Sequence, residues 1–299
     1  MTHISVCVCT FNRRQPLRRL LNALLQQETD GQFTYSIVIA DNDHLRSAED
    51  VVSSFAKSSA IPIRYCVEPK QNIARARNKT VENADGDLLA FIDDDEFPTH
   101  RWLITLLKAV EEFSVSGALG PVRPVFDSTP PDWVIAGHFH DRPEDRTGVR
   151  LNSRKCRTGN ALVVRDVFAN RPQPFRPECL NGEDQDFFAR LINEGHEFVW
   201  CNEAVVYEAV PPARWTRQFL WRRSLIRGMF SIRNVATRPP AGLVLRTLVA
   251  LPVLGLALPV ALVWGQAAFM RVACKFSYHT GRLCAFLGLN PLGDPIRRD

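Results

Sequence analysis

Short apolar segments alternate with amphipathic helical patterns through the first 120 residues of the chain. Residues 4–9, 35–40 and 88–92 are apolar on both faces, whereas the leucines between Leu17 and Leu25 recur with the spacing of one helix face. Strands that are apolar on both faces and separated by helices indicate a mostly parallel sheet covered by helices on both sides. The sequence therefore predicts an α/β fold.

The patterns after residue 113 are less regular. The expected elements, in chain order, are a strand at 118–122, a Pro-, Asp- and Arg-rich loop at 123–157, a strand at 161–164, a helix at 183–193, strands at 198–200 and 204–207, and a strongly basic helix at 214–232.

The composition is that of an ordinary globular protein, because 45% of the 299 residues are hydrophobic and 23% are charged. This excludes a wholly disordered, collagen-like or coiled-coil chain. The net charge is +5, and basic residues predominate from Arg214 onwards. A C-terminal region that is both basic and apolar indicates contact with an anionic membrane surface, and nucleic acid is not expected as a partner.

The cysteine pattern and the N-terminus both indicate a cytosolic protein. The eight cysteines form no CxxC pair and no metal-like cluster, which favours reduced thiols over disulfides. The first residues show no signal-peptide pattern. We therefore expect the protein at the cytoplasmic face of the inner membrane, attached through its C-terminal region.

Polar residues end three of the expected strands, namely Thr10, Asp41 and Asp93. In open α/β sheets the ligand crevice lies beyond the carboxyl ends of the strands. We therefore expect these three side chains to line a binding site.

Four consecutive acids, Asp93, Asp94, Asp95 and Glu96, follow the third of these strands. Neighbouring carboxylates repel one another, and a divalent cation with hard oxygen ligands, Mg²⁺ or Mn²⁺, relieves the repulsion. Such ions usually take one or two protein carboxylates and complete their shell with water and diphosphate oxygens. The alternatives are a contact to ribose hydroxyls and a solvated acidic turn.

A helix is expected to begin near Asn72, and its N-terminus is suited to anions. Arg75 and Asn78 share one face of this helix, so Arg75 is the candidate for a nucleotide contact. Arg77 points elsewhere and is expected to be a surface salt-bridge residue.

The pair Glu183 and Asp184 begins another expected helix. Acids in a first helical turn often only complement the helix dipole. The functional alternative is a general base that takes the proton of an attacking hydroxyl group.

Residues 247–270 form an uncharged apolar segment interrupted by Pro252 and Pro259. The segment is long enough to cross a bilayer, but two prolines near its middle favour a kinked or re-entrant hairpin. A buried core helix is the alternative. The basic helix at 214–232 is expected to lie on the membrane surface, to hold the diphosphate of a lipid-linked acceptor, or simply to pack on the core.

Six motifs in residues 4–193 resemble those of the inverting family 2 glycosyltransferases, which have the GT-A fold. In order they are ISVCVCTFNR, IVIADND, EPKQNIARARN, GDLLAFIDDDEFP, TGNALVV and NGEDQDFFARL. The following VVYEAVPPARWTRQFLWRRSLIRG resembles the bacterial subgroup that builds exopolysaccharides, and succinoglycan-type glucosyltransferases are the most similar. The resemblance covers about residues 1–235.

The resemblance implies a nucleotide-sugar site made of Thr10, Asn12, Arg13, Asp41, Asn72, Arg75, Asp93, Asp94, Asp95, Gly159, Asn160, Arg222 and Arg223. Thr10 and Asp41 would bind the base, and Asp95, as the last acid of the DXD motif, would ligate Mn²⁺ or Mg²⁺. Asp184 would be the catalytic base, and Glu183 would orient the acceptor. Many relatives have a metal-assisting histidine near the end of this region, where this chain has Val206, Tyr207 and Glu208, so a third protein ligand is not implied.

The implied activity is transfer of a sugar from a nucleotide sugar, with uridine diphosphate as the expected carrier, to a membrane-associated glycan or polyprenyl-diphosphate-linked acceptor. The expected domains are a GT-A domain at 1–213, with a nucleotide-binding half at 1–122 and an acceptor-side half at 123–213, a basic interface helix at 214–240 and an apolar membrane-associated region at 241–299. A non-catalytic sugar-nucleotide-binding scaffold at the membrane and a sugar nucleotidyltransferase are the alternatives.

Overall fold

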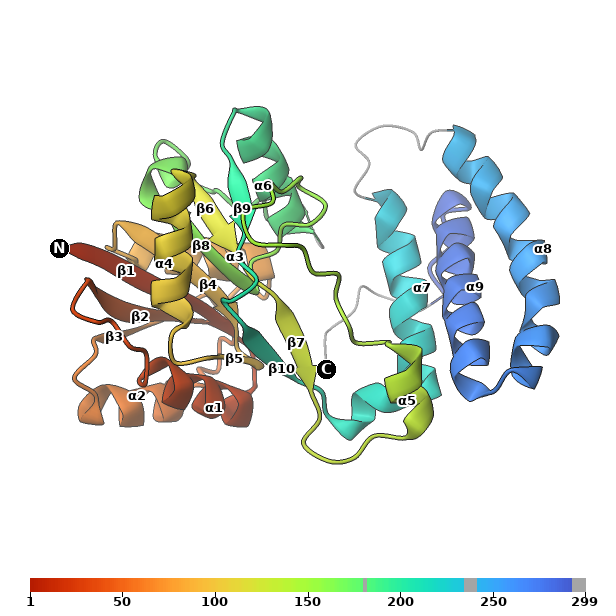
Figure 1. Ribbon diagram of the computed structural model, residues 1–299, viewed down its shortest axis with the longest axis horizontal. Coiled ribbons are helices and arrows are strands. Elements are labelled where there is room, and N and C mark those ends of the chain that lie inside the picture. Colours follow the sequence, from red (N-terminus) through yellow and green to blue (C-terminus); the bar gives the residue numbers. More distant parts are fainter. Residues whose placement is uncertain (180–181, 234–240, 292–299) are drawn as a thin grey trace. The chain divides into compact units, whose positions relative to one another are not determined.

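The computed structural model describes residues 1–179, 182–233 and 241–291 (Figure 1). The chain forms two compact units. The first consists of Met1–Val125 and Arg142–Ala209, and the second of Phe126–Asp141 and Val210–Asp299. The motif residue Asn181 and the segments 234–240 and 292–299 of the expected C-terminal regions lie outside the described residues.

A seven-stranded sheet in the order β3-β2-β1-β4-β8-β6-β9 forms the centre of the first unit. Its strands are β1 (Thr2–Thr10), β2 (Phe33–Asp41), β3 (Ile63–Val67), β4 (Leu88–Asp93), β6 (Gly117–Leu119), β8 (Asn160–Val164) and β9 (Phe198–Trp200). β1 to β4 are parallel, as are β6 and β9, whereas β8 is antiparallel to both of its neighbours. The predicted mostly parallel α/β sheet is therefore confirmed.

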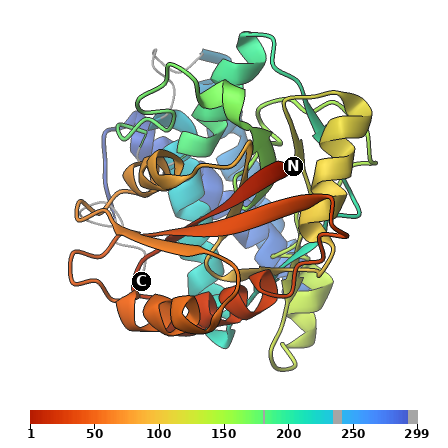
Figure 2. The same cartoon turned by 90° about the vertical axis from the view of Figure 1, so that its left-hand side faces the viewer.

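Helices cover both faces of this sheet, as the apolar strands require. One hydrophobic cluster joins it to α1 (Arg14–Leu24), α2 (Glu49–Ser58) and α4 (Trp102–Phe113). The other joins it to α3 (Ile73–Asn83) and α6 (Glu183–Asn193). In Figure 2 the red strands separate α1 and α2, below, from α3, above.

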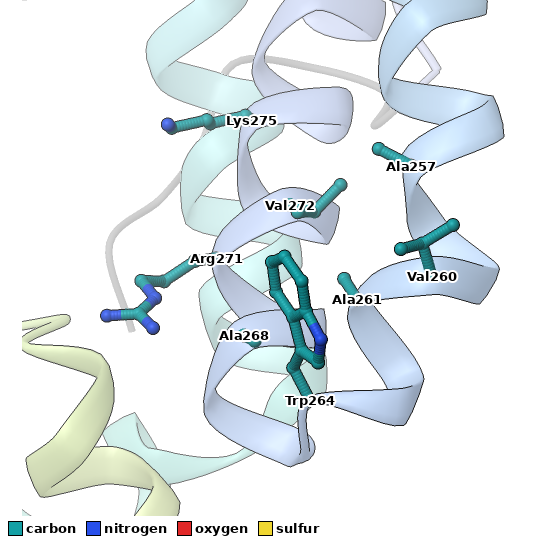
Figure 3. A pocket seen from close by; sticks show the side chains of 8 residues that line it. All are labelled: Ala257, Val260, Ala261, Trp264, Ala268, Arg271, Val272 and Lys275. Atoms are coloured by element: carbon teal, nitrogen blue, oxygen red, sulfur yellow. The ribbon is translucent and has the colours of Figure 1, made fainter.

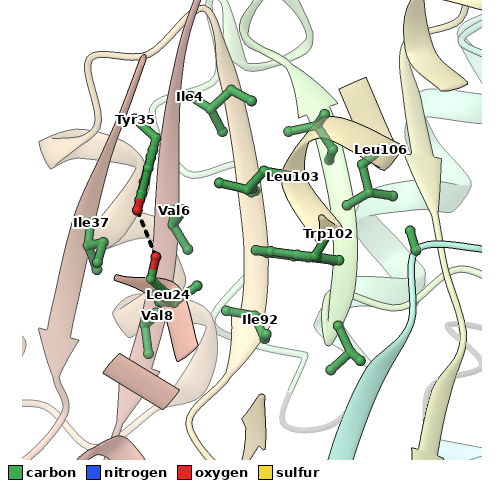
Figure 4. Close-up of a cluster of buried hydrophobic side chains, with 14 of the residues drawn as sticks. Ile4, Val6, Val8, Leu24, Tyr35, Ile37, Ile92, Trp102, Leu103 and Leu106 are labelled. Carbon is green, nitrogen blue, oxygen red and sulfur yellow. Dashed lines mark hydrogen bonds between the residues drawn. The ribbon is translucent and has the colours of Figure 1, made fainter. Parts of the chain in front are cut away.

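The first cluster shows how the sequence pattern produces this packing. Ile4, Val6 and Val8 alternate along β1 and point to the same side, where Trp102 of α4 is also fully buried (Figure 4). The Tyr35 hydroxyl group, which is buried with them, donates a hydrogen bond of 2.8 Å to the carbonyl of Leu24 at the end of α1.

A second sheet has the order β5-β10-β7, with β5 at Glu96–Pro98, β10 at Val206–Ala209 and β7 at Val122–Val125. The prediction of a single strand at 118–122 is therefore wrong. These residues are divided between β6 and β7, which belong to different sheets. The division falls at Gly120, where an added Cβ would lie only 2.4 Å from the carbonyl oxygen of Ala204. β5 begins at Glu96, the last acid of the acidic run, and was not expected.

The second unit is helical. Its elements are α5 (Asp132–Gly137), the 3₁₀ turn η2 (Pro212–Trp215), α7 (Arg217–Arg233), α8 (Ala241–Val263) and α9 (Gln266–Phe286). The prediction that 123–157 is entirely loop-like is wrong, because α5 and most of β7 lie within this range. α7 and α9 approach closely through glycine, since a Cβ on Gly228 would lie 1.9 Å from the carbonyl oxygen of Tyr278.

The apolar segment forms a hairpin, but its turn is not at the prolines. α8 continues through Pro252 and Pro259 and ends at a turn around Gly265, whose φ of +97° favours glycine. Among the described residues, α8 is the one helix long and apolar enough to cross a membrane, with a mean hydropathy of 2.1 over Gly242–Val263. Only 6% of that stretch is buried, so within this chain it is not a core helix.

Candidate active site

The carboxyl ends of three parallel strands meet at one edge of the large sheet. Thr10 of β1 pairs in register with Asp41 of β2, and Cys9 pairs with Asp93 of β4. The three polar residues expected to line one site are therefore neighbours across the strand ends.

Arg13 lies against the acidic run that follows β4. Its Nη1 atom is 2.9 Å from Asp94 Oδ1 and 3.1 Å from Asp95 Oδ2. Asn12, with a φ of 51°, takes the left-handed conformation that asparagine tolerates, at the turn between β1 and α1. Attraction between Arg13 and these carboxylates thus offsets part of the repulsion within the run.

Asp94 is a buried member of the acidic run. It is 4% exposed, and its second oxygen accepts a hydrogen bond of 2.8 Å from the Thr10 hydroxyl group. Burial raises the pKa of Asp94 to about 6, although Arg13 and Thr10 oppose the shift. The Asp95 side chain is 16% exposed against 5% for Asp94, so Asp95 is the more accessible of the two to an external ligand.

Asp41 holds the loop after β2 rather than pointing to solvent. It is fully buried and accepts hydrogen bonds from the backbone N–H groups of Asp43 and Ala48 and from the Tyr65 hydroxyl group. The predicted contact between Asp41 and a nucleotide base stays a prediction.

Asn72 begins α3 as its N-cap, and its Oδ1 accepts a hydrogen bond of 3.1 Å from the backbone N–H of Arg75. Its Nδ2 donates to the carbonyl of Pro177, which fixes the segment before α6. Arg75 is half-buried, and within the described part of the chain its guanidinium group makes no hydrogen bond or ion pair. It therefore stays the candidate for a nucleotide contact.

Arg77 is the residue on which the two acidic clusters converge. Its side chain is 9% exposed; Nη1 forms an ion pair with Glu183 of α6, and Nη2 lies 3.5 Å from Asp93 Oδ1 of β4. Burial opposes the charge, but Glu183 and Asp93 outweigh it and raise the pKa of Arg77. The expectation that Arg77 is a surface salt-bridge residue is therefore wrong.

The sequence pattern of α3 already indicates that Arg77 is buried. Arg77 follows Ala74 by three residues and precedes Asn78 by one, and all three belong to the buried face of α3. An arginine on a buried helix face needs carboxylate partners, and the chain offers them at Asp93 and Glu183.

The acid pair that begins α6 is divided between two environments. Glu183 is 6% exposed and held by Arg77, whereas Asp184 is partly exposed and accepts a hydrogen bond of 2.8 Å from the backbone N–H of Gln185. Burial raises the pKa of Asp184, and the nearby charges of Arg77 and Arg157 oppose the shift. Asp184 is thus the acid of the pair that is open to a proton donor.

Gly159 closes the other side of the acidic run. A Cβ there would lie 2.8 Å from Glu96 Oε1 and 3.3 Å from Asp93 Oδ2, so these carboxylates leave no room for a side chain. Glu96 is 1% exposed; its Oε2 accepts from the backbone N–H of Asp93, and Arg142 lies 3.9 Å from Oε1. Burial raises the pKa of Glu96, which favours the neutral acid.

Glu208, which ends the stretch where many relatives have a histidine, pairs across the strands with Glu96. Its Oε2 lies 2.6 Å from Nη2 of Arg142.

Asn160 is 2% exposed, and its side chain is hydrogen-bonded to the Trp102 indole and to the carbonyls of Pro121 and Ala204. Its predicted contact with a sugar stays a prediction.

Arg222 and Arg223 belong to α7 in the second unit. Arg222 is exposed, and Nη2 of Arg223 donates a hydrogen bond of 2.9 Å to the carbonyl of Phe139. Their predicted nucleotide-sugar contacts stay predictions.

The acidic edge fits a divalent cation that is shared with a substrate phosphate. Within the described residues, no three His, Cys, Asp or Glu side chains are grouped to hold a metal ion by themselves. Mg²⁺ and Mn²⁺ sites often use only one or two carboxylates together with phosphate oxygens. Asp95, 16% exposed, and Asp93, 43% exposed, supply such hard oxygen donors at the strand ends.

Comparison with known proteins is consistent with this geometry. Residues 5–170 match the Glycosyl transferase family 2. The succinoglycan biosynthesis protein ExoM of Rhizobium meliloti is 33% identical over 244 residues, which cover 79% of this chain and 76% of that protein.

Two solved structures are similar in fold. The mannosyltransferase PcManGT from Pyrobaculum calidifontis, in complex with GDP-Man and Mn²⁺, has a TM-score of 0.63 at 17% identity, covering 95% of this chain and 86% of that one. Staphylococcus aureus TarS 1–349 in complex with UDP has a TM-score of 0.56 at 14% identity, covering 99% and 94%.

Proposed function

The chain belongs to the family 2 glycosyltransferases, and from this premise we propose that it transfers a sugar, with inversion, from a nucleotide sugar to a membrane-associated glycan or polyprenyl-diphosphate-linked acceptor. One observation carries the proposal. Arg77 contacts both Asp93 at the donor-side strand end and Glu183 next to Asp184, so the two acidic clusters share one guanidinium group.

On the donor side, Thr10 and Arg13 hold Asp94, whose side chain is 5% exposed, and the more exposed Asp95, at 16%, is proposed to bind a cation. Mn²⁺ or Mg²⁺ bound there would offset the charge that grows on the leaving nucleoside diphosphate. The Mn²⁺ in the PcManGT complex supports this choice of cofactor. Arg75, whose guanidinium group makes no hydrogen bond or ion pair within the described residues, is proposed to bind the nucleotide.

On the acceptor side, Asp184 is proposed as the general base. Burial raises its pKa, and a carboxylate with a raised pKa accepts a proton more readily. Glu183 is less accessible to an acceptor, because its carboxylate is held in an ion pair with Arg77 and is only 6% exposed. Attack by the deprotonated hydroxyl group on the face opposite the leaving diphosphate inverts the anomeric centre.

The likeness to ExoM favours an exopolysaccharide acceptor, and the exposed apolar α8 together with the basic α7 supports attachment at the membrane. The proposed location is the cytoplasmic face of the inner membrane, with the C-terminal region as the attachment.

The proposal is tested by nucleotide release from a panel of UDP- and GDP-sugars with Mn²⁺ or Mg²⁺, followed by NMR of the product. We expect release from one donor, dependent on the metal, and a product with inverted anomeric configuration. Binding of a donor without any release would favour the scaffold alternative, and a product with retained configuration would contradict the proposed base.

A further inference from the structure

A groove lies between α8 and α9 in the second unit, with a volume of about 420 Å³. Its lining is mostly apolar and includes Ala257 and Val260 of α8, Trp264 of the turn that follows α8, and Val272 of α9 (Figure 3). Val260 is 56% and Trp264 79% exposed, so the chain itself leaves this apolar surface uncovered. The volume is that of a site for a small molecule or a single lipid chain.

Two cations border the groove along α9. Arg271 and Lys275 are one helical turn apart, and in Figure 3 both extend to the side of α9 away from α8, at the border of the groove rather than within its apolar part. Within the described residues, Lys275 makes no hydrogen bond or ion pair, and the one hydrogen bond of Arg271 reaches the carbonyl of Ala136 at 3.5 Å. Both charges are therefore available to an anion.

The helices around the groove contain no acidic residue that could pair with Arg271 or Lys275. No aspartate or glutamate occurs between Glu208 and Asp294, a stretch that contains all of α7, α8 and α9. A second copy of the chain that docked through its own α7, α8 and α9 would bring Arg271 and Lys275 against helices that also lack acids, so this contact would gain no charge pair. An anionic lipid satisfies both the apolar lining and the two cations.

We propose that this groove binds one anionic membrane phospholipid, with an acyl chain along Ala257, Val260 and Trp264 and its phosphate on Arg271 and Lys275. The inference rests on the proposed attachment to the membrane, but it adds a discrete lipid site that general attraction to a charged surface does not require.

The test uses the full chain reconstituted with vesicles that contain brominated phosphatidylcholine, alone or mixed with brominated phosphatidylglycerol. Bromine quenches a nearby indole, and the difference between wild type and Trp264→Phe isolates the signal of Trp264. We expect tighter, saturable quenching by phosphatidylglycerol. The double variant Arg271→Gln/Lys275→Gln should weaken this preference about thirty-fold, since two cations near an anionic headgroup are lost.

The matched control is Arg217→Gln/Arg246→Gln, which removes the same charge from exposed positions of α7 and α8 outside the groove. It should retain the preference of Trp264 for phosphatidylglycerol. An equal loss in both double variants would show general electrostatic attraction only, and equal quenching by both lipids would also overturn the proposal.

Two further outcomes are decisive. If soluble glycerol phosphate displaced the brominated lipid from the groove as strongly as unlabelled phosphatidylglycerol does, the groove would recognise phosphate alone. If two copies of the chain were cross-linked at Trp264 and the lipids gave no quenching, the groove would be a dimer contact. Nucleotide release measured on the same preparations reports donor turnover separately, so a wild-type protein that releases nucleotide normally but shows no preference for phosphatidylglycerol contradicts this inference and not the proposed activity.

Discussion

Removal of the Arg77 guanidinium group should both destabilise the protein and uncouple its two acidic clusters. Arg77 is 7% and Glu183 6% exposed, so Arg77→Gln leaves a carboxylate buried without its partner. Breaking a buried pair from one side costs about 3–5 kcal/mol. We expect a loss of this size in the free energy of unfolding, measured by urea titration of the full chain in detergent at pH 7.

Two comparisons separate the ion pair from other effects of the substitution. In a double-mutant cycle, Arg77→Gln and Glu183→Gln together should cost less than the sum of the two single changes, with a coupling of about 1–3 kcal/mol. The matched control, Arg64→Gln, removes an arginine that is 54% exposed and lies 3.7 Å from an exposed Asp85, and it should change stability by less than about 1 kcal/mol.

An Arg77→Gln variant as stable as wild type at pH 7, with no coupling to Glu183→Gln, would refute the argument that this pair joins the clusters.

Three more outcomes follow from the acidic edge. Gly159→Ala should weaken donor binding in calorimetry, because the added Cβ would lie 2.8 Å from Glu96 Oε1. The control Gly242→Ala adds a Cβ that meets nothing within 4 Å, and it should leave donor binding unchanged. Equal effects of the two substitutions would show that the contact with Glu96 is not responsible. Asp95→Ala should abolish the increase in donor affinity that Mn²⁺ gives, and an undiminished increase would assign the metal elsewhere. Because burial raises the pKa of Asp94 to about 6, its contribution to stability is full below the unfolded pKa near 4 and is lost as the pH rises through 6. Asp94→Asn should therefore flatten the unfolding free energy between pH 4 and 6, and an unchanged slope would contradict the shift.

The central sheet could be predicted from sequence because its strands are buried on both faces. Apolar runs at 35–40 and 88–92 have no other stable place than between two layers of helices, and β2 and β4 occupy it. The strand expected at 118–122 failed because an apolar run does not reveal where the chain changes sheets. Likewise, Pro252 and Pro259 were expected to break a helix that the structure continues through both.

The candidate site was predictable only where several functional residues are adjacent in sequence. The acidic run after β4 and the pair at the start of α6 were found in this way, but their link through Arg77 depends on which face of α3 packs on the sheet. Asn160 shows the opposite case, since its motif suggested a ligand contact while three hydrogen bonds, from Trp102 and to two carbonyls, occupy its side chain.

The most direct test of the proposed chemistry is single-turnover sugar transfer by Asp184→Asn, with donor binding measured in parallel. Loss of the general base should slow transfer by about 10²–10⁴-fold while donor affinity stays near that of wild type. The control Asp186→Asn changes an acid of the same helix turn that is paired with Arg190 at 2.9 Å, and it should retain most of the transfer rate. A transfer rate in Asp184→Asn within a few-fold of wild type would contradict the account.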